Sequence, residues 1–241
     1  MTALAVSFDA PLAYGEGIRI QEALLEARAA DAIPDVVLFL QHRPVVTLGN
    51  RGRREHLLLS ETALHERGIE LAHASRGGDV TYHGPGQLVM YPILRLGAHE
   101  ADAHGYLWNL EEIAVRTADE FGVQAWRREG KNGAWTEAGK IAAIGFRLKR
   151  WVTLHGMSFN VDLDLSGFES IVPCGLVGEP VASLHTLLGE TCPSVPDVKA
   201  AMARHFETVM GRTLEHHSAD QPPECLQGLG IQCSGFGTEK A

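Results

Sequence analysis

The sequence predicts a mixed α/β domain in which several helices pack on a largely antiparallel sheet. Segments with strand character outnumber helical segments, and the two kinds do not alternate strictly along the chain, unlike a regular series of βαβ units. At 241 residues, of which 45 % are hydrophobic, the chain is long enough for a full core. No internal repeat, low-complexity block or clear linker divides it, so we expect a single domain over residues 1–213.

The first half of the chain predicts one long helix and a series of short strands. An imperfect apolar stripe predicts a helix over residues 14–30 with Gln21 on its outer face. A continuous apolar run predicts a buried strand over residues 36–40. The remaining segments expected here are strands at 45–48, 69–74 and 88–96 and a short helix at 57–67.

The second half contains the two clearest helices. Apolar residues recur at helical spacing over residues 106–121, and Ser194 with Asp197 forms a capping pattern for a helix that Gly211 ends. Strands are expected at 123–126, 141–148 and 152–161, and the last two should pair through a turn near Lys149 and Arg150. Residues 214–241 are polar and aperiodic, so we expect a mobile C-terminal tail.

Composition excludes several classes of partner. The chain has 21 Lys and Arg against 30 Asp and Glu, a net charge of −9, which argues against nucleic acid or an anionic membrane as a partner. No apolar run approaches the ~20 residues of a transmembrane helix. A secretory signal requires basic residues before its apolar segment, and none precedes the first apolar residues here. The four cysteines lack CxxC pairing. We therefore expect free thiols and a cytoplasmic protein.

The densest group of unusual residues is the stretch 75–87, SRGGDVTYHGPGQ. Arg76 offers a planar, permanently charged guanidinium. The pair Gly77 and Gly78 lets the backbone approach another group closely or adopt a positive φ. His83 is expected to act either as a proton carrier near neutral pH or as a hydrogen-bond partner. These residues indicate a binding loop, and the alternative is a glycine-rich hairpin loop without a ligand.

This stretch resembles the signature of the octanoyltransferases of lipoate synthesis. The similarity continues in the family's order through residues 139–145 (GKIAAIG), 155–160 (HGMSFN) and 173–175 (PCG), and so extends from residue 76 to residue 175. It implies the fold shared by biotin protein ligases, lipoate ligases and class II synthetases. It also implies an acyl transfer that needs no ATP, metal or other cofactor.

The resemblance assigns the chemistry to Cys174 and Lys140. Cys174 would accept the octanoyl group from octanoyl-acyl carrier protein. A lysine of a lipoyl domain, in a 2-oxoacid dehydrogenase complex or the glycine cleavage H protein, would then attack the thioester. An ordinary thiol has a pKa of ~8.5 and is only a few per cent ionised at neutral pH, so the thiol needs a nearby cation. Lys140 precedes an apolar run, and we expect partial desolvation to favour its neutral form.

The residues expected to bind the substrate come from the first three matched blocks. Small residues there would leave room for a straight acyl chain, and Thr81 and His83 could form hydrogen bonds near the thioester. Backbone N–H groups at Gly77, Gly78 or Gly175 are candidates for the oxyanion hole. Ordinary sheet packing is the alternative for the apolar members. The full set is Arg76, Gly77, Gly78, Asp79, Val80, Thr81, Tyr82, His83, Ala143, Ile144, Gly145, Gly156, Met157 and Ser158.

Three basic clusters stand out on this acidic chain, within residues 51–54, 127–131 and 147–150. At least one of them is expected to receive the acidic carrier protein, although each is also compatible with a solvated surface. Four C-terminal residues could be imagined as metal ligands, but their spacing is irregular and no metal site is predicted. They are His216, His217, Cys225 and Cys233.

Three other functions stay open. An ATP-dependent lipoate–protein ligase shares the implied fold, but ligases resemble a Gly-Gly-Gly variant of the motif with Asp after the histidine. Here Gly84 follows His83. A non-catalytic module that binds lipoyl domains would not need both Lys140 and Cys174. A thioesterase, in which water replaces the acceptor lysine, is distinguishable only by assay.

Overall fold

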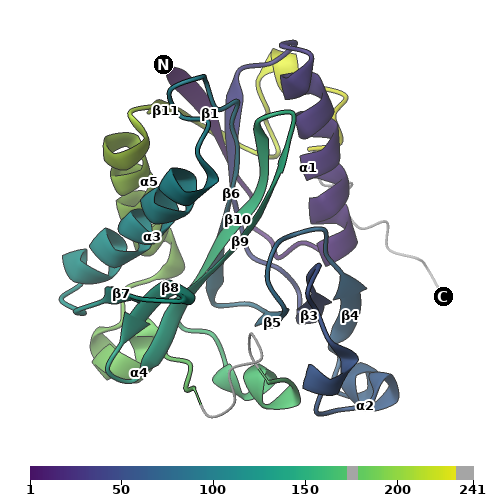
Figure 1. The fold of residues 1–241 in the computed structure, drawn as a ribbon, viewed down its shortest axis with the longest axis vertical. Coiled ribbons are helices and arrows are strands. Elements are labelled where there is room, and N and C mark those ends of the chain that lie inside the picture. The colour runs from purple at the N-terminus through teal and green to yellow at the C-terminus, as the bar shows by residue number, and fades with distance from the viewer. Residues whose placement is uncertain (173–178, 232–241) are drawn as a thin grey trace.

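The computed structural model describes residues 1–172 and 179–231 (Figure 1). Within these residues the strands are β1 (Thr2–Ser7), β2 (Asp35–Leu40), β3 (Val45–Leu48), β4 (Glu70–His73), β5 (Val80–His83), β6 (Gln87–Ile93), β7 (Trp126–Arg128), β8 (Lys131–Thr136), β9 (Gly139–Lys149), β10 (Val152–Asn160) and β11 (Thr213–Ser218). The α-helices are α1 (Tyr14–Ala29), α2 (Glu61–Glu66), α3 (Ala103–Glu120), α4 (Leu184–Leu188) and α5 (Val195–Met210). Short 3-10 turns are Arg54–His56, Leu165–Ser170, Gly189–Thr191 and Glu224–Leu226.

The strands form two sheets. The larger has the order β11-β1-β2-β6-β10-β9-β8-β7, and the smaller has the order β4-β3-β5. Only β1 with β11, β1 with β2 and β3 with β4 run parallel among the paired named strands. The expected mixed α/β fold with a largely antiparallel sheet is therefore confirmed.

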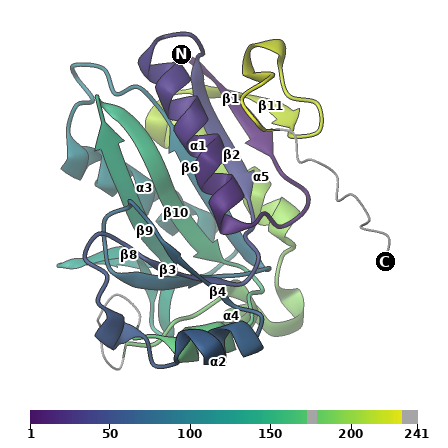
Figure 2. The ribbon, with the colours of Figure 1, turned by 90° about the vertical axis from the view of Figure 1, so that its right-hand side faces the viewer.

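Helices cover both faces of the larger sheet. Helices α3 and α5 lie together on one face, and α1 lies on the other (Figures 1 and 2). The continuous apolar run of β2 after Asp35 is explained by burial on both faces. Val37 and Phe39 join the core beneath α3 and α5, whereas Leu38 and Leu40 join the core beneath α1. A strand that is buried on both faces reads as a continuous hydrophobic run.

Local signals position the hairpin and the last long helix as predicted. Strands β9 and β10 pair antiparallel, and the turn between them contains Arg150 and Trp151, both at positive φ, as a tight two-residue hairpin turn requires. The side chain of Ser194 accepts a hydrogen bond from the backbone of Asp197 at the start of α5. Gly211 ends that helix in the left-handed conformation, with φ 62°.

Several predicted elements are corrected by the structure. The strand expected at 123–126 begins only at Trp126, because Val123 still donates its N–H to Ala118 at the end of α3. Helix α2 is shorter than expected, since Ser60 caps it. Gln21, expected on the outer face of α1, is fully buried, and its side-chain oxygen accepts a hydrogen bond from the backbone N–H of His155 at 2.8 Å.

The predicted C-terminal tail is also corrected for residues 214–231. Strand β11 continues the larger sheet, pairing with β1 along its whole length. Leu214, Leu226 and Ile231 are buried in the core. This edge strand is mostly polar, so its sequence lacks the apolar alternation that would predict a strand. The helical turn that follows is too short to show a periodicity.

Candidate active site

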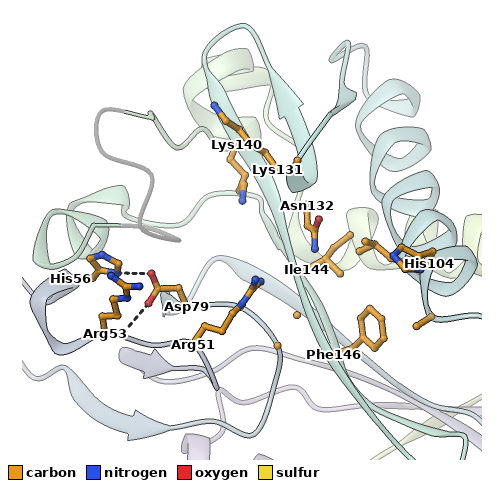
Figure 3. A pocket seen from close by; sticks show the side chains of 16 residues that line it. Arg51, Arg53, His56, Asp79, His104, Lys131, Asn132, Lys140, Ile144 and Phe146 are labelled. Carbon is orange, nitrogen blue, oxygen red and sulfur yellow. Dashed lines mark hydrogen bonds and ion pairs between the residues drawn. The ribbon is translucent and has the colours of Figure 1, made fainter.

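A cleft of about 710 Å³ lies where the smaller sheet meets β8 and β9 (Figure 3). The antiparallel pairing of β3 with β5 brings the loop that follows Leu48 beside the loop that precedes Val80, and these two loops form one side of the cleft. The start of α3 closes another side. The residues that line the cleft are Arg51, Arg53, His56, Gly77, Gly78, Asp79, Ala103, His104, Leu107, Gly130, Lys131, Asn132, Lys140, Ile144, Gly145 and Phe146.

The two loops are held together by backbone hydrogen bonds. Gly49, Asn50 and Arg51 donate their N–H groups to the carbonyl oxygens of Asp79, Arg76 and Gly78, at 2.9, 3.0 and 3.0 Å. A Cβ on Gly49 would lie 2.6 Å from the Gly78 oxygen, so only glycine permits this approach. Gly49 therefore lets the loop that follows β3 lie directly against the motif.

Asp79 is the one carboxylate among the described residues that line the cleft. Its side chain accepts hydrogen bonds from the ring of His56, with 2.5 Å between the heavy atoms, and from the backbone N–H of Arg53 at 3.1 Å (Figure 3). These contacts direct both carboxylate oxygens into the loop that follows β3. Asp79 therefore acts in the structure as an anchor for that loop.

A smaller inner cavity, of about 50 Å³, lies next to the cleft. The two spaces share the lining residues Gly78, Asp79, Ile144 and Gly145, so they are adjacent. The structure brings most of the predicted substrate-binding residues to this cavity, from loops and strands far apart in the sequence. Its lining residues are Tyr14, Arg76, Gly78, Asp79, Thr81, His83, Val89, Tyr91, Ala143, Ile144, Gly145, His155, Gly156, Met157 and Ser158.

Of the predicted set, Gly77 lines only the outer cleft, and Val80 and Tyr82 line neither space. Val80 and Tyr82 point to the other side of β5, where they pack in a separate hydrophobic cluster with Leu64 of α2. Side chains alternate between the two faces of a strand, so Thr81 and His83 reach the cavity and their neighbours do not. Including Val80 and Tyr82 in the binding set was therefore wrong as a matter of position.

Two glycines of the set have another role than the one expected. A Cβ on Gly156 would lie 2.4 Å from the Met90 oxygen, and a Cβ on Gly145 would lie 2.9 Å from the Gly77 oxygen. These glycines let neighbouring chains approach closely. Their small size therefore packs the walls together rather than opening room for an acyl chain.

Lys140 lies in the cleft, as the resemblance implies, and only 9 % of it is exposed. Its ammonium group lies 4.8 Å from the centre of the Trp135 ring. Its backbone N–H donates to Pro180, and its carbonyl accepts from Ala182. Lys140 is thus fixed beside the point where the described chain resumes after residues 173–178. Cys174, the predicted nucleophile, lies outside the described residues, as do Gly175 and Cys233.

Three buried histidines lie at the inner cavity: His83 and His155 line it, and His42 packs against His83, with 5.7 Å between the ring centres. Burial lowers the pKa of His42 to about 4 and the pKa values of His83 and His155 to about 3. All three are neutral at physiological pH. Tyr14 and Tyr91 pack against these rings, and burial raises the pKa of Tyr14 to about 12, so its hydroxyl keeps its proton.

His83 is oriented by a chain of hydrogen bonds. Its Nδ1 donates to the Gln87 side-chain oxygen at 2.6 Å, Gln87 donates to Asn160 at 2.9 Å, and Asn160 donates to the carbonyl of Ala182 at 2.9 Å. A neutral ring that donates through Nδ1 has an acceptor at Nε2. The chain ends two residues from Pro180, so it links His83 to the segment that holds Lys140.

Sequence reasoning missed several residues of the site. His155 has φ 59° within β10, a conformation that non-glycine residues rarely adopt and that often accompanies a functional site. Tyr14, at the start of α1, and Tyr91, on β6, line the cavity without any sequence motif that marks them. His155 could have been found, because it opens one of the matched blocks.

Two absences hold for residues 1–172 and 179–231. No group of three or more His, Cys, Asp and Glu side chains is arranged to hold a metal ion. None of the helices combines the length and the hydropathy needed to cross a bilayer.

Comparisons with known proteins agree on one family. The model described as "Lipoyl protein ligase A/B catalytic domain" matches residues 13–207. An octanoyltransferase of Syntrophotalea carbinolica is 46 % identical over 197 residues, covering 82 % of this chain and 90 % of that protein. An octanoyltransferase of Geobacter metallireducens is 43 % identical over 211 residues, covering 88 % and 95 %.

Solved structures support the fold. Lipoate-protein ligase A bound with ATP has a TM-score of 0.78 at 17 % identity, covering 95 % of this chain and 93 % of that one. Biotin protein ligase from Aquifex aeolicus has a TM-score of 0.50 at 11 % identity, covering 87 % and 70 %. The expected likeness to lipoate and biotin ligases is confirmed.

Proposed function

The chain belongs to the octanoyltransferases of the lipoyl protein ligase A/B catalytic domain family, and we propose that Cys174 and Lys140 carry out its reaction. The donor is octanoyl-acyl carrier protein. The acceptor is a lysine of a lipoyl domain, in 2-oxoacid dehydrogenase complexes or the glycine cleavage H protein. The reaction proceeds through a thioester on the enzyme.

In the first step the Cys174 thiolate attacks the carbonyl carbon of the octanoyl thioester. A new C–S bond forms, the C–S bond to the carrier breaks, and the carrier thiolate takes up a proton. The proton taken up by the carrier comes from the Lys140 ammonium, which leaves Lys140 as a neutral amine. In the second step the acceptor amine attacks the enzyme thioester, an amide forms, the Cys174 thiolate leaves, and the amine's proton passes to Lys140. Thioester exchange is nearly isoenergetic and amide formation is downhill, so neither step needs ATP.

Lys140 is proposed to move the protons. Its ammonium group stabilises the thiolate before the first step, and its neutral amine accepts a proton from the acceptor lysine in the second. The burial of Lys140 and its fixed backbone support this role. A buried group of fixed position is a better proton carrier than a solvated surface lysine, because its geometry is set before the substrate arrives.

The octanoyl chain is proposed to lie in the inner cavity. That cavity is small, so an eight-carbon chain must displace flexible side chains as it enters. Met157 and Ile144 line it, and methionine adapts its shape at low cost because it is unbranched. Burial of each methylene contributes about 0.8 kcal/mol, which gives the site a means of selecting chain length.

The observation that supports this function best is that the cleft that holds Lys140 shares four wall residues with the inner cavity. It allows a thioester near Lys140 with its acyl chain inserted below. Intact-mass measurement tests the proposal: octanoyl-carrier without ATP should give an octanoyl adduct on the enzyme. Adding a lipoyl domain should move that mass to the domain, and hydrolysis without transfer would indicate a thioesterase instead.

A further inference from the structure

The cleft is lined mainly by basic side chains, although the protein as a whole is acidic. The whole chain has a net charge of −9, yet the described residues that line the cleft include four Lys and Arg side chains and one carboxylate. The cations are Arg51, Arg53, Lys131 and Lys140, and the carboxylate is Asp79. A concave positive site on an acidic surface concentrates anions at that place.

Most basic residues of the other two clusters, including Lys131 at the cleft, are paired with carboxylates. In the cluster at 127–131, Arg127 pairs with Glu111 and Glu112, while Arg128 and Lys131 pair with Glu179. In the cluster at 147–150, Lys149 and Arg150 share Glu26. Such pairs leave little field for an external anion, so these two clusters are poor candidates for an anion site.

The cluster at 51–54 differs. Arg54 pairs with Glu61 outside the cleft, but no acidic side chain within residues 1–172 and 179–231 forms an ion pair with Arg51 or Arg53. Both are exposed and both line the cleft. Hydrogen bonds from the backbone of these same residues fix the loop to Gly78 and to the Asp79 side chain. The two guanidinium groups therefore project from a rigid loop, which reduces the entropy lost on binding.

The position of Arg51 and Arg53 relative to Lys140 indicates which kind of anion could bind there. Figure 3 shows Arg51 and Arg53 on the opposite side of the cleft from Lys131 and Lys140. An anion bound at the arginines is thus separated from a thioester at Lys140, although the same cleft holds both. The prosthetic arm of an acyl carrier has this layout, with a phosphodiester at one end and the thioester at the other.

We propose that Arg51 and Arg53 bind the phosphodiester of the carrier's pantetheine arm. Guanidinium groups suit this task because each offers paired N–H donors to phosphate oxygens. The site lies inside a cleft, which admits a flexible arm more readily than the surface of a folded carrier. This inference rests on the proposed function, since it assumes an acyl-carrier donor.

Three octanoyl donors distinguish recognition of the phosphate from recognition of the carrier's protein surface. They are octanoyl-carrier, octanoyl-phosphopantetheine and octanoyl-pantetheine, which has no phosphate. The Arg51→Glu/Arg53→Glu variant should raise KM at least tenfold for both phosphate-containing donors. Its effect on octanoyl-pantetheine should be several-fold smaller. The matched control Arg19→Glu/Arg67→Glu changes the net charge equally at two exposed arginines that lie outside the three basic clusters and line no part of the cleft, and should match the wild type on all three donors.

Two results would overturn the phosphate site. An equal loss on octanoyl-phosphopantetheine and octanoyl-pantetheine would mean that the arginines do not recognise phosphate, and a loss confined to the carrier would assign them to its protein surface. The milder Arg51→Gln/Arg53→Gln variant should show the same order of donors if charge reversal disturbs folding. Wild-type enzyme is assayed first with all donors; failure there would refute the octanoyl transfer itself, independently of the arginines.

Discussion

Lys140 and Trp135 form a cation–aromatic pair in the cleft, with the Lys140 ammonium 4.8 Å from the ring centre. Trp135 is almost fully buried, and its indole N–H donates to the carbonyl of Lys131, so the ring is fixed. Arg128 and Lys131 approach the same ring, at 4.7 and 5.8 Å. A fixed aromatic face thus orients the lysine to which we assign proton transfer.

The first prediction distinguishes two roles of Lys140, stabilising the thiolate by its charge and transferring a proton. Lys140→Ala should slow alkylation of Cys174 near neutral pH about tenfold, because the thiol returns toward its ordinary pKa, and should abolish transfer. Lys140→Arg should retain part of the alkylation rate but not transfer, since guanidinium does not release its proton. Alkylation rates over a pH series provide the measurement, with Lys199→Ala as the control. A wild-type alkylation profile for Lys140→Ala would leave Lys140 without this role.

The second prediction concerns the nucleophile. Cys174→Ala should lose the octanoyl adduct, whereas Cys192→Ala, Cys225→Ala and Cys233→Ala should keep it. Burial and the nearby carboxylate of Asp162 raise the pKa of the Cys192 thiol, which makes it a poor nucleophile at neutral pH. Intact mass after incubation with octanoyl-carrier gives the answer, and an adduct on Cys174→Ala would refute the thioester at that residue.

The third prediction tests the inner cavity as the acyl site. Ala143→Leu adds three carbons to a cavity wall, so octanoyl should lose about 2 kcal/mol of binding from displaced methylenes, roughly a thirtyfold fall in kcat/KM. A butanoyl thioester, which reaches less deeply, should lose much less. Thermal unfolding of the variant serves as the control for folding. Equal losses on the two chain lengths would place the acyl chain elsewhere.

The fourth prediction concerns acid stability. His42, His83 and His155 have lowered pKa values in the folded protein, about 4, 3 and 3, against ~6.5 when unfolded. Below pH 6.5 these histidines bind protons in the unfolded chain but stay neutral in the folded protein. The free energy of unfolding therefore falls as the pH falls from about 6.5 to about 4. The cost is about 2 kcal/mol per histidine at pH 5.

Melting temperatures between pH 7.5 and pH 5 check this prediction. His83→Gln removes one of the three groups, so its melting temperature should fall less over that range than that of the wild type. His65→Gln alters an exposed histidine on α2 and should retain the full fall. If His83→Gln shows the wild-type fall, protonation of His83 is not linked to unfolding.

The sequence predicted the parts of the site that lie within continuous motifs. Gly77 and Gly78 belong to one such motif. The segments of β9 and β10 meet because a short turn joins the two strands and places Ala143 opposite Ser158. Local pattern was enough for these elements, since hydrophobic alternation and turn residues both depend on neighbours in sequence.

Other parts depend on contacts between distant segments and could not be predicted in this way. Gln21 has the polarity of an outward residue, yet it is buried because the left-handed backbone of His155, 134 residues later, needs an acceptor for its N–H. Tyr14 reaches the cavity only through the packing of α1 on β6 and β10. In the sequence, Arg51 and Arg53 form an ordinary basic stretch. Their place in the cleft depends on the pairing of β3 with β5, which positions their loop.

The parallel pairing of β1 with β11 has a consequence for biosynthesis. Ala3 lies opposite Leu214, so the N-terminal strand leaves the ribosome long before the strand that covers its outer edge. Until then β1 can pair only with β2, and its buried apolar side chains flank an open row of backbone N–H and C=O groups. Exposed edges of this kind promote intermolecular pairing. A nascent or prematurely terminated chain that ends before residue 213 is therefore a natural client for chaperones.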